Sequence, residues 1–288
     1  MISKKTYFQD NGYIIFENTI SHQKIDRLLD EFENFKDKNK LFYSQSLHNW
    51  RKAKLDIDKN GFLRNSVENF TDLMWANNLA ELGRDILLST DILEILQLIG
   101  RNEPYSMWQN MFFDKSTGTI DHLDSWYLDS YPNGHLIGVW IALEDMSEEN
   151  GTFHVYPRSH KIPKKNWDKL SHDKAKEYFS KMVVGLEKLP ANLNKGDILL
   201  WHPFLIHGSS HQCKEGFSRK SLTAHYNPRS LNKGNGKVGF VSENKDNYKF
   251  KNLPISTKSP FNSKIESLKG LFKYYLSFKN KINRDMRR

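Results

Sequence analysis

The feature that most restricts the fold of this chain is a change of hydrophobic period near residue 104. Before it, apolar residues follow helical spacing. The stretch STDILEILQLIG, for example, predicts a helix that begins after Ser89 or Thr90 and stops at Gly100. After it, turn residues separate short segments that are typical of strands. These segments are YSMWQNMFF (105–113), LIGVWIAL (136–143), TFHVY (152–156), DILLWH (197–202) and RKSLTAHY (219–226).

Helices followed by many short strands predict a mainly β fold with helical cover. The strands would form an antiparallel barrel or a double-sheet jelly roll. The dipeptide Asn150-Gly151 favours a hairpin turn between two of the strands. Within 105–113 the alternation predicts that Met107, Gln109 and Met111 share one face.

The 288 residues suit one large domain with a short addition. We expect the domain over 1–263, with a helical region at about 1–103, a β core at about 104–228 and a polar loop at about 231–259. The segment 264–288 is a basic tail, expected to be helical. Its eight basic and two acidic residues carry +6 of the formal net charge of +9.

Composition narrows the class of protein. An apolar share of 38% and an aromatic share of 13% argue against disorder. The single cysteine, Cys213, allows no internal disulfide, which favours a reducing compartment, and the N-terminus lacks a secretory apolar core. We therefore expect a cytoplasmic protein. The body shows no basic stripe interleaved with aromatic residues, so nucleic acid is not an expected partner.

A possible metal site begins with the stretch DHLDSW. On a strand, His122 and Asp124 would point to one face, and they would supply two ligands of a 2-His-1-carboxylate site for iron. The same pair would also suit a hydrogen-bonded strand end. The third ligand should be a histidine on a later strand. His207 in GDILLWHPFLIHGSS is the best candidate and His202 is its rival. We expect the donor atoms of His122, Asp124 and His207 to lie within about 4.5 Å of one another.

Arg219 adds an independent element. It begins the last predicted strand, twelve residues after His207, and would share a face with Ser221 and Thr223. A guanidinium group with a neighbouring hydroxyl suits the distal carboxylate of a cosubstrate. A surface arginine is the alternative, and the spacing to His207 favours the binding role.

Between about Tyr105 and Asn227 the sequence resembles the phytanoyl-CoA dioxygenase family of iron(II)/2-oxoglutarate oxygenases. The motifs HLD, GVWIALEDMSEENGTFHVYPRSHK, GDILLWHPFLIHGSS and RKSLTAHYNP follow that family's pattern in order and spacing. The opening FQDNGYIIFENTISHQKIDRLLDEF is similar to its N-terminal helix region. One departure is Arg158, where the family usually has glycine, and the resemblance fades after about Pro228.

The resemblance implies a double-stranded β-helix, or cupin-like, core and assigns roles to residues. It makes His122, Asp124 and His207 the iron ligands and Arg219 the anchor of 2-oxoglutarate. It places three further residues at the cosubstrate, namely Trp140, Gln109 and, more weakly, Ser209. Together with Ser221 beside the anchor, these complete the predicted site.

The implied reaction is hydroxylation of an unactivated C–H bond, with O2 as oxidant, release of succinate and CO2, and ascorbate as a stimulatory reductant. Asp124 favours this outcome because related halogenases replace the carboxylate with a small residue. A small metabolite, a lipid or a glycan intermediate would be the substrate. Two alternatives remain open: a cupin-like metal-binding protein or isomerase that does not use 2-oxoglutarate, and a non-catalytic interaction protein.

Other candidates favour structural roles. We expect His154, His160, His211 and His225 not to bind the metal, and His211 and His225 to lie either just behind the ligands or at the surface. Trp126 and Tyr127 either line the substrate mouth or pack in the interior. The tail is expected to dock on the body by an aromatic helical face. Reversible contact with an anionic membrane surface is the alternative. The sequence does not define the oligomeric state.

Overall fold

The computed structural model describes residues 3–37, 40–44, 50–73, 76–163, 170, 172–210 and 214–233. The predictions for the tail, for the polar loop beyond residue 233 and for His211 and Cys213 lie outside the described residues. Among the helices of the described ranges, none is both long and apolar enough to cross a membrane.

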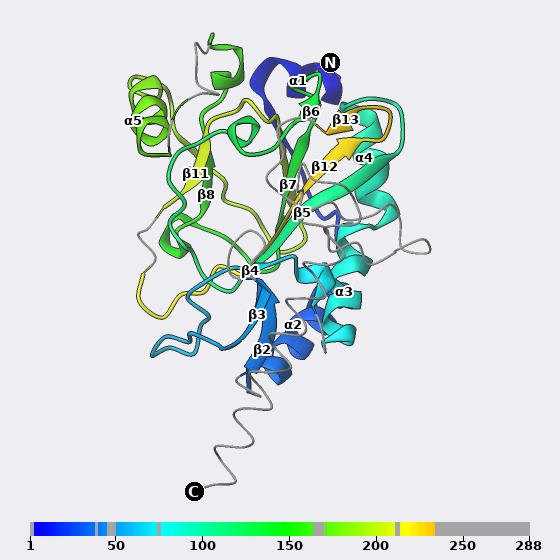
Figure 1. Ribbon diagram of the computed structural model, residues 1–288, viewed down its shortest axis with the longest axis vertical. Coiled ribbons are helices and arrows are strands. Elements are labelled where there is room, and N and C mark those ends of the chain that lie inside the picture. Colours follow the sequence, from blue (N-terminus) through cyan, green and yellow to red (C-terminus); the bar gives the residue numbers. More distant parts are fainter. Residues whose placement is uncertain are drawn as a thin grey trace, which may run out of the picture.

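An antiparallel sheet of eight strands forms the centre of the molecule (Figure 1). Its strand order is β1-β10-β7-β12-β5-β4-β2-β3. The bounds are β1 (Tyr13–Phe16), β2 (Lys40–Ser44), β3 (Trp50–Lys54), β4 (Val67–Glu68), β5 (Tyr105–Phe113), β7 (Ile137–Ala142), β10 (Ile198–Trp201) and β12 (Ser221–Pro228).

A smaller antiparallel sheet faces the large one. It has the order β11-β8-β9, with β8 at Phe153–Val155, β9 at Leu189–Pro190 and β11 at His207–Ser209. A third pair joins β6 (Ser130–Tyr131) to β13 (Asn232–Lys233). In Figure 1, β8 and β11 lie on one side of β7, β12 and β5, and α3 and α4 lie on the other.

Five α-helices occur in the described residues. They are α1 (Lys4–Asn11), α2 (His22–Asp37), α3 (Asn77–Leu87), α4 (Thr90–Ile99) and α5 (His172–Met182). Short 3₁₀ helices add Phe70–Asp72, Asp124–Trp126, Glu148–Asn150 and Ser159–Lys161.

One face of the large sheet packs against the helices. This core contains three residues of β12, namely Leu222, Ala224 and Tyr226. Phe32 of α2 packs in the same core, and its ring centroid lies 4.3 Å from that of Phe112. Each of these side chains is at most 1% exposed. The alternation of β12 therefore directs every second residue into an apolar helix–sheet interface.

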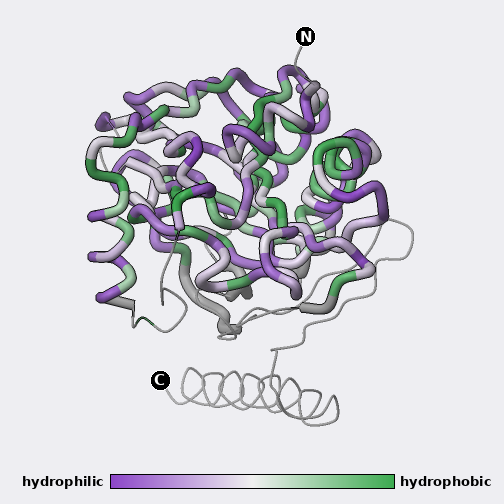
Figure 2. The backbone as a smooth tube through the Cα atoms, turned by 90° about the horizontal axis from the view of Figure 1, so that it is seen from above, coloured by the Kyte–Doolittle hydropathy of each residue, from purple (hydrophilic) through white to green (hydrophobic). Residues whose placement is uncertain are grey.

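The opposite face of the large sheet meets the small sheet. Trp140, Phe153 and Trp201 form part of a second buried cluster between the two sheets. The ring centroid of Phe153 lies 5.3 Å from Trp140 and 5.1 Å from Trp201. In Figure 2, hydrophobic segments run through the middle of the body and hydrophilic residues lie mostly around its outside. Two packed antiparallel sheets with helices over one face confirm the predicted jelly-roll fold.

Several local predictions are confirmed. The helix predicted before residue 100 is α4, where Ser89 accepts a hydrogen bond from the Ile92 amide and Gly100 ends the helix. All five predicted strand segments contain a strand of the structure. The structure also explains why the family usually has glycine where this chain has Arg158. This residue adopts a left-handed conformation with φ of 66°, the region that glycine prefers.

Three local predictions were wrong. The region predicted to be helical, about 1–103, also contributes strands, and one of them, β1, forms an edge of the large sheet. Asn150-Gly151 ends a 3₁₀ turn rather than a hairpin, because β7 and β8 belong to different sheets. Met107 was predicted to share a face with Gln109 and Met111, but it packs on the helix side of the sheet. The pairing of β5 with β12 shifts by one residue between Ala224 and Tyr226, so the residues of β5 on either side of the shift point to opposite faces.

Candidate active site

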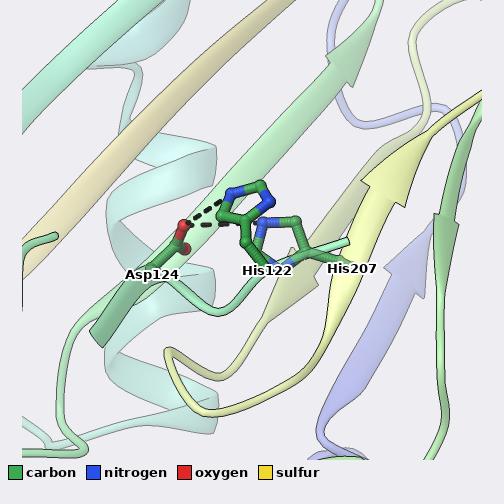
Figure 3. A group of neighbouring side chains, drawn as sticks. All are labelled: His122, Asp124 and His207. Carbon is green, nitrogen blue, oxygen red and sulfur yellow. Dashed lines mark ion pairs between the residues drawn. The ribbon is translucent and has the colours of Figure 1, made fainter. Parts of the chain in front are cut away.

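His122, Asp124 and His207 meet between the two sheets (Figure 3). Asp124 Oδ1 lies 3.7 Å from His122 Nε2 and 3.4 Å from His207 Nε2. One donor atom from each residue lies within 4.8 Å of the other two, close to the expected 4.5 Å. Two imidazole nitrogens and one carboxylate oxygen at this spacing form a ligand set that suits iron, with further positions open.

Backbone pairing brings the two histidines together. His122 and His207 form an isolated antiparallel bridge, with both N–H to O=C distances at 2.9 Å. Asp124 does not continue this extended segment but begins a 3₁₀ helix. The shared-face argument was therefore only partly correct. The turn, rather than a continuous strand, directs the carboxylate toward the histidines.

The histidine rings are oriented for metal binding. His122 Nδ1 lies 2.7 Å from the Ile120 carbonyl, and His207 Nδ1 lies 2.9 Å from the Leu205 carbonyl. A carbonyl oxygen accepts only, so each Nδ1 carries the proton and each Nε2 keeps its lone pair. Both lone pairs therefore belong to the atoms that face Asp124. Such backbone contacts are typical of histidines that bind metals.

The two oxygens of Asp124 have different surroundings. Oδ2 accepts a hydrogen bond of 2.6 Å from the Trp201 indole and lies 3.1 Å from His225 Nε2. Burial alone would raise the pKa of Asp124, but the imidazoles of His225 and His207 hold it well below its usual range. Asp124 is therefore ionised at neutral pH, as a metal ligand must be.

Burial has the opposite consequence for His122. Together with the neighbouring His207, burial lowers the pKa of His122 to about 4, even though Asp124 favours the protonated form. The ring is therefore neutral at pH 7. A neutral imidazole beside an ionised carboxylate is the protonation state in which both groups bind a cation.

Arg219 lies inside the protein next to the same space. It is only 2% exposed, and its guanidinium carbon lies 5.2 Å from the ring centroid of Phe113 and 5.7 Å from that of Trp140. It precedes β12 by two residues rather than beginning it. Trp140 Nε1 and Ser221 Oγ are among the buried polar atoms that have no hydrogen-bond partner within the described residues. A buried cation with unmatched polar neighbours suits a carboxylate ligand such as that of 2-oxoglutarate.

Ser209 and Gln109 are the two other residues predicted to lie at the cosubstrate. Ser209 is buried on β11, and its hydroxyl accepts a hydrogen bond of 2.8 Å from the Thr119 amide. It therefore holds the segment that leads to His122. Gln109 is half-buried on β5. The neighbouring Asp121 serves a similar purpose to Ser209. It accepts hydrogen bonds from two side chains of the small sheet region, His154 at 2.6 Å and Tyr156 at 2.8 Å.

The rival ligand His202 lies elsewhere. Its ring centroid lies 5.2 Å from that of His160 and 6.4 Å from that of Phe8, beside α1. It lines a separate cavity of about 310 Å³. The sequence missed the contact of Trp201 with Asp124, and it left open whether His225 lies behind the ligands or at the surface; the structure places it behind Asp124. Their inward positions on predicted strands were the only signal that could have indicated them.

Trp126 and Tyr127 differ in their surroundings. Trp126 packs with Leu123 and Phe179, so that α5 covers the segment that carries the metal-binding candidates. Tyr127 is half-buried, and its ring meets His122 edge to face at 5.8 Å between centroids. Of the two residues, Tyr127 therefore lies beside the candidate metal site.

The fold and the side chains together define a class of protein, the oxygenases with a double-stranded β-helix and a His-Asp-His site. The family model described as phytanoyl-CoA dioxygenase (PhyH) matches residues 8–220. The chain is similar to the peroxisomal phytanoyl-CoA dioxygenase of Mus musculus, with 25% identity over 238 residues, 78% of this chain and 68% of that protein.

Two further similarities extend over most of the chain. A Caenorhabditis elegans homolog of phytanoyl-CoA dioxygenase domain-containing protein 1 is 25% identical over 293 residues, 85% of this chain and 96% of that protein. The fold is similar to the crystal structure of the epimerase SnoN in complex with Fe3+, alpha ketoglutarate and nogalamycin RO. That match has a TM-score of 0.57 at 14% identity and covers 82% of this chain and 84% of that one.

The chain therefore belongs to the phytanoyl-CoA dioxygenase family. It is an iron(II)- and 2-oxoglutarate-dependent dioxygenase. The alternatives of a cupin-like protein that does not use 2-oxoglutarate and of a non-catalytic protein are set aside by this membership.

Proposed function

We propose that His122, Asp124 and His207 bind Fe(II) and that Arg219 binds the distal carboxylate of 2-oxoglutarate. The meeting of the three donors at 3.4 to 4.8 Å carries this proposal. Iron and 2-oxoglutarate, when bound, supply the oxidation of a C–H bond by O2 with release of succinate and CO2. The other contributions belong to the chain's own side chains.

Those side chains bind, orient and exclude water. Arg219 offers a planar donor pair for a carboxylate, and Ser221 and Trp140 offer unmatched polar atoms beside it. Trp140 and Phe153 surround this region with buried rings, which lowers the local dielectric and strengthens each charged contact. Gln109 is proposed as a further polar contact and Ser209 as a weaker one.

The proposed reaction is hydroxylation of an unactivated C–H bond. Retention of Asp124 supports it, because this carboxylate fills the position that a halide would need. The substrate is proposed to be a small metabolite, a lipid or a glycan intermediate. The similar mammalian proteins are named for phytanoyl-CoA, whereas the similar solved structure is that of an epimerase. The names of proteins with similar sequence or fold therefore point to chemically different substrates.

A succinate-release screen tests this proposal. The protein is incubated with Fe(II), ascorbate, 2-oxoglutarate and one candidate substrate at a time. We expect at least one substrate to raise succinate formation well above the uncoupled background, with a product heavier by one oxygen atom. The matched control is Asp124→Ala, which should give neither. Hydroxylation would be contradicted if every substrate that raises succinate formation gave no oxygenated product.

The cell compartment is a secondary part of the proposal. Cys213 as the single cysteine supports a reducing compartment such as the cytoplasm. The relatives of Mus musculus and other mammals are described as peroxisomal, which is also compatible with a protein that needs no disulfide. Weak contact of the basic tail with an anionic membrane surface remains a proposal that rests on its charge alone.

A further inference from the structure

Trp201, Gly138 and His225 form a row across three neighbouring strands of the large sheet. In the register of the sheet, Gly138 of β7 lies opposite Trp201 of β10 on one side and His225 of β12 on the other. The Trp201 and His225 rings meet edge to face, with 5.7 Å between centroids and an angle of 86°. All of this lies on the face that meets the small sheet.

Both side chains of the row reach the same oxygen of Asp124. The Trp201 indole donates to Oδ2 at 2.6 Å, and His225 Nε2 lies 3.1 Å from it. The carboxylate only accepts, so the proton of the second contact belongs to His225 Nε2. Oδ2 thus accepts two hydrogen bonds, while Oδ1 faces His122 and His207.

Gly138 makes this arrangement sterically feasible. A Cβ atom at this position would overlap the six-membered ring of the Trp201 indole. Any other residue would therefore push the indole away from the sheet and away from Asp124. The absence of a side chain at Gly138 lets a large ring lie flat across β7 and still reach the carboxylate.

We infer that Trp201 and His225 are positioning residues that fix Asp124 so that it offers only Oδ1 to the metal, and that Gly138 permits this. The inference rests on the proposed function, because it assumes that Asp124 binds iron. Holding one oxygen away from the metal makes the carboxylate a ligand through a single atom, which leaves one more position open for cosubstrate or O2. Hydrogen-bonded partners of this kind set both the direction and the affinity of a metal ligand.

The experiment measures metal affinity apart from turnover. Binding of Fe(II) under anaerobic conditions, and of Co(II) with its visible absorption, is followed for the full chain and its variants. Trp201→Phe keeps the ring packing but removes the donor, and we expect it to weaken binding about tenfold or more. Its Co(II) spectrum should also change, because Oδ2 becomes free to join the coordination.

Two variants keep the inference testable if Trp201→Phe does not fold. Gly138→Ala removes no donor but displaces the indole, and it should weaken metal binding to a similar extent. For His225, the variant His225→Gln keeps an N–H donor and should bind metal more tightly than His225→Leu. This partial rescue is not expected if the ring only fills space.

Matched controls separate positioning from stability. Tyr226→Phe removes a buried hydrogen bond of 2.6 Å to the Leu87 carbonyl on the opposite face of β12. Gly83→Ala places a Cβ atom 2.7 Å from the Phe70 ring, away from the site. Both should lower the unfolding temperature and leave the metal dissociation constant within about twofold, since neither touches a ligand.

The outcomes are distinct. If the parent binds neither Fe(II) nor Co(II), the proposed metal site itself fails. A second outcome is that the parent binds metal and that every variant binds it equally well, namely Trp201→Phe, Gly138→Ala and the two His225 variants. The positioning role is then overturned while the metal site stands. Weakening by the Tyr226 and Gly83 variants to the same extent would also overturn it, because the effect would then be one of general stability.

Discussion

The two faces of β12 differ in how their buried side chains are satisfied. On the helix side, Leu222 and Ala224 are fully buried in apolar contacts. On the side of the small sheet, Ser221 Oγ and His225 Nδ1 are equally buried, yet they have no hydrogen-bond partner in the described part of the chain. One face therefore stabilises the fold, and the other buries unmatched polar groups, which costs stability and which we assign to ligand binding. Substitutions on the two faces should separate binding from folding.

The largest effect is expected from Asp124→Ala. This change removes one of the three proposed ligands and leaves the donors of Trp201 and His225 without an acceptor. We expect loss of detectable Fe(II) binding and of succinate formation, even with saturating 2-oxoglutarate. Anaerobic calorimetry measures the binding. Replacement of the exposed Asp145 by alanine is the control and should leave binding unchanged. Full activity of Asp124→Ala would contradict the assignment of the site.

Arg219→Ala should separate cosubstrate binding from metal binding. Loss of a buried, charge-assisted contact costs about 2–4 kcal/mol, or about 30- to 1000-fold in affinity for 2-oxoglutarate. Iron binding should be largely retained. The measurement is the KM for 2-oxoglutarate together with the metal dissociation constant.

The neighbouring Lys220 provides the control for Arg219. Its ammonium group points to the helix side, 3.2 Å from Glu33 and 3.5 Å from Asp114. Lys220→Met should lower stability without changing the KM for 2-oxoglutarate. An unchanged KM in Arg219→Ala would show that the cosubstrate anchor is misassigned.

On the helix side, Leu222→Ala should act on folding alone. The side chain is fully buried between the sheet and the helices. Its truncation should lower the free energy of unfolding by about 2–5 kcal/mol, from lost burial and the cavity left behind. Urea unfolding measures this loss. At a temperature where the variant is folded, its affinity for Fe(II) should equal that of the parent. A clear decrease would mean that the two faces are coupled.

The smallest effect concerns pH and the metal-free protein. Burial lowers the pKa of His122 from 6.5 to about 4, so the folded chain resists a proton that the unfolded chain accepts. Stability from this group is present above pH 6.5 and is lost as the pH falls toward 4. Between pH 7.5 and 5 the loss is about 2 kcal/mol.

His122→Gln provides the comparison for this pH dependence, because its side chain is neutral at every pH. Urea unfolding of the metal-free parent should therefore lose more stability between pH 7.5 and 5 than the variant does. Parallel curves for the two proteins would contradict the lowered pKa. A smaller loss of stability in the parent than in the variant would mean that folding raises the pKa of His122 instead of lowering it.

Local patterns predicted much of this fold. The strand predicted at 219–226 and the Ser89 and Gly100 boundaries of α4 are properties of short sequence windows, and the structure has them. Which strands pair with one another in a sheet is not a property of a short sequence window. β7 and β8 follow each other along the chain but enter different sheets, and β1 joins the large sheet through β10. Such pairings depend on how distant segments pack, which hydrophobic period alone does not encode.

The candidate site shows the same division. His122 and Asp124 were conspicuous because a metal needs those donor types, and His207 followed from the expected spacing of the motifs. The donors behind Asp124 had no such signal. Trp201 reads as an ordinary apolar strand residue, and His225 reads as one of many histidines. Only the register that places Gly138 between them shows why they reach one oxygen.

The most direct test of the account is an anaerobic titration of Fe(II) and 2-oxoglutarate, followed by visible absorbance. Chelation of iron by the keto acid gives a charge-transfer band that neither component gives with the protein alone. We predict that this band forms with the parent and is lost in Asp124→Ala. With Arg219→Ala it should require about 30- to 1000-fold more 2-oxoglutarate. Absence of the band from the parent, with both components at saturating concentration, would contradict the central claim that this site binds iron and 2-oxoglutarate together.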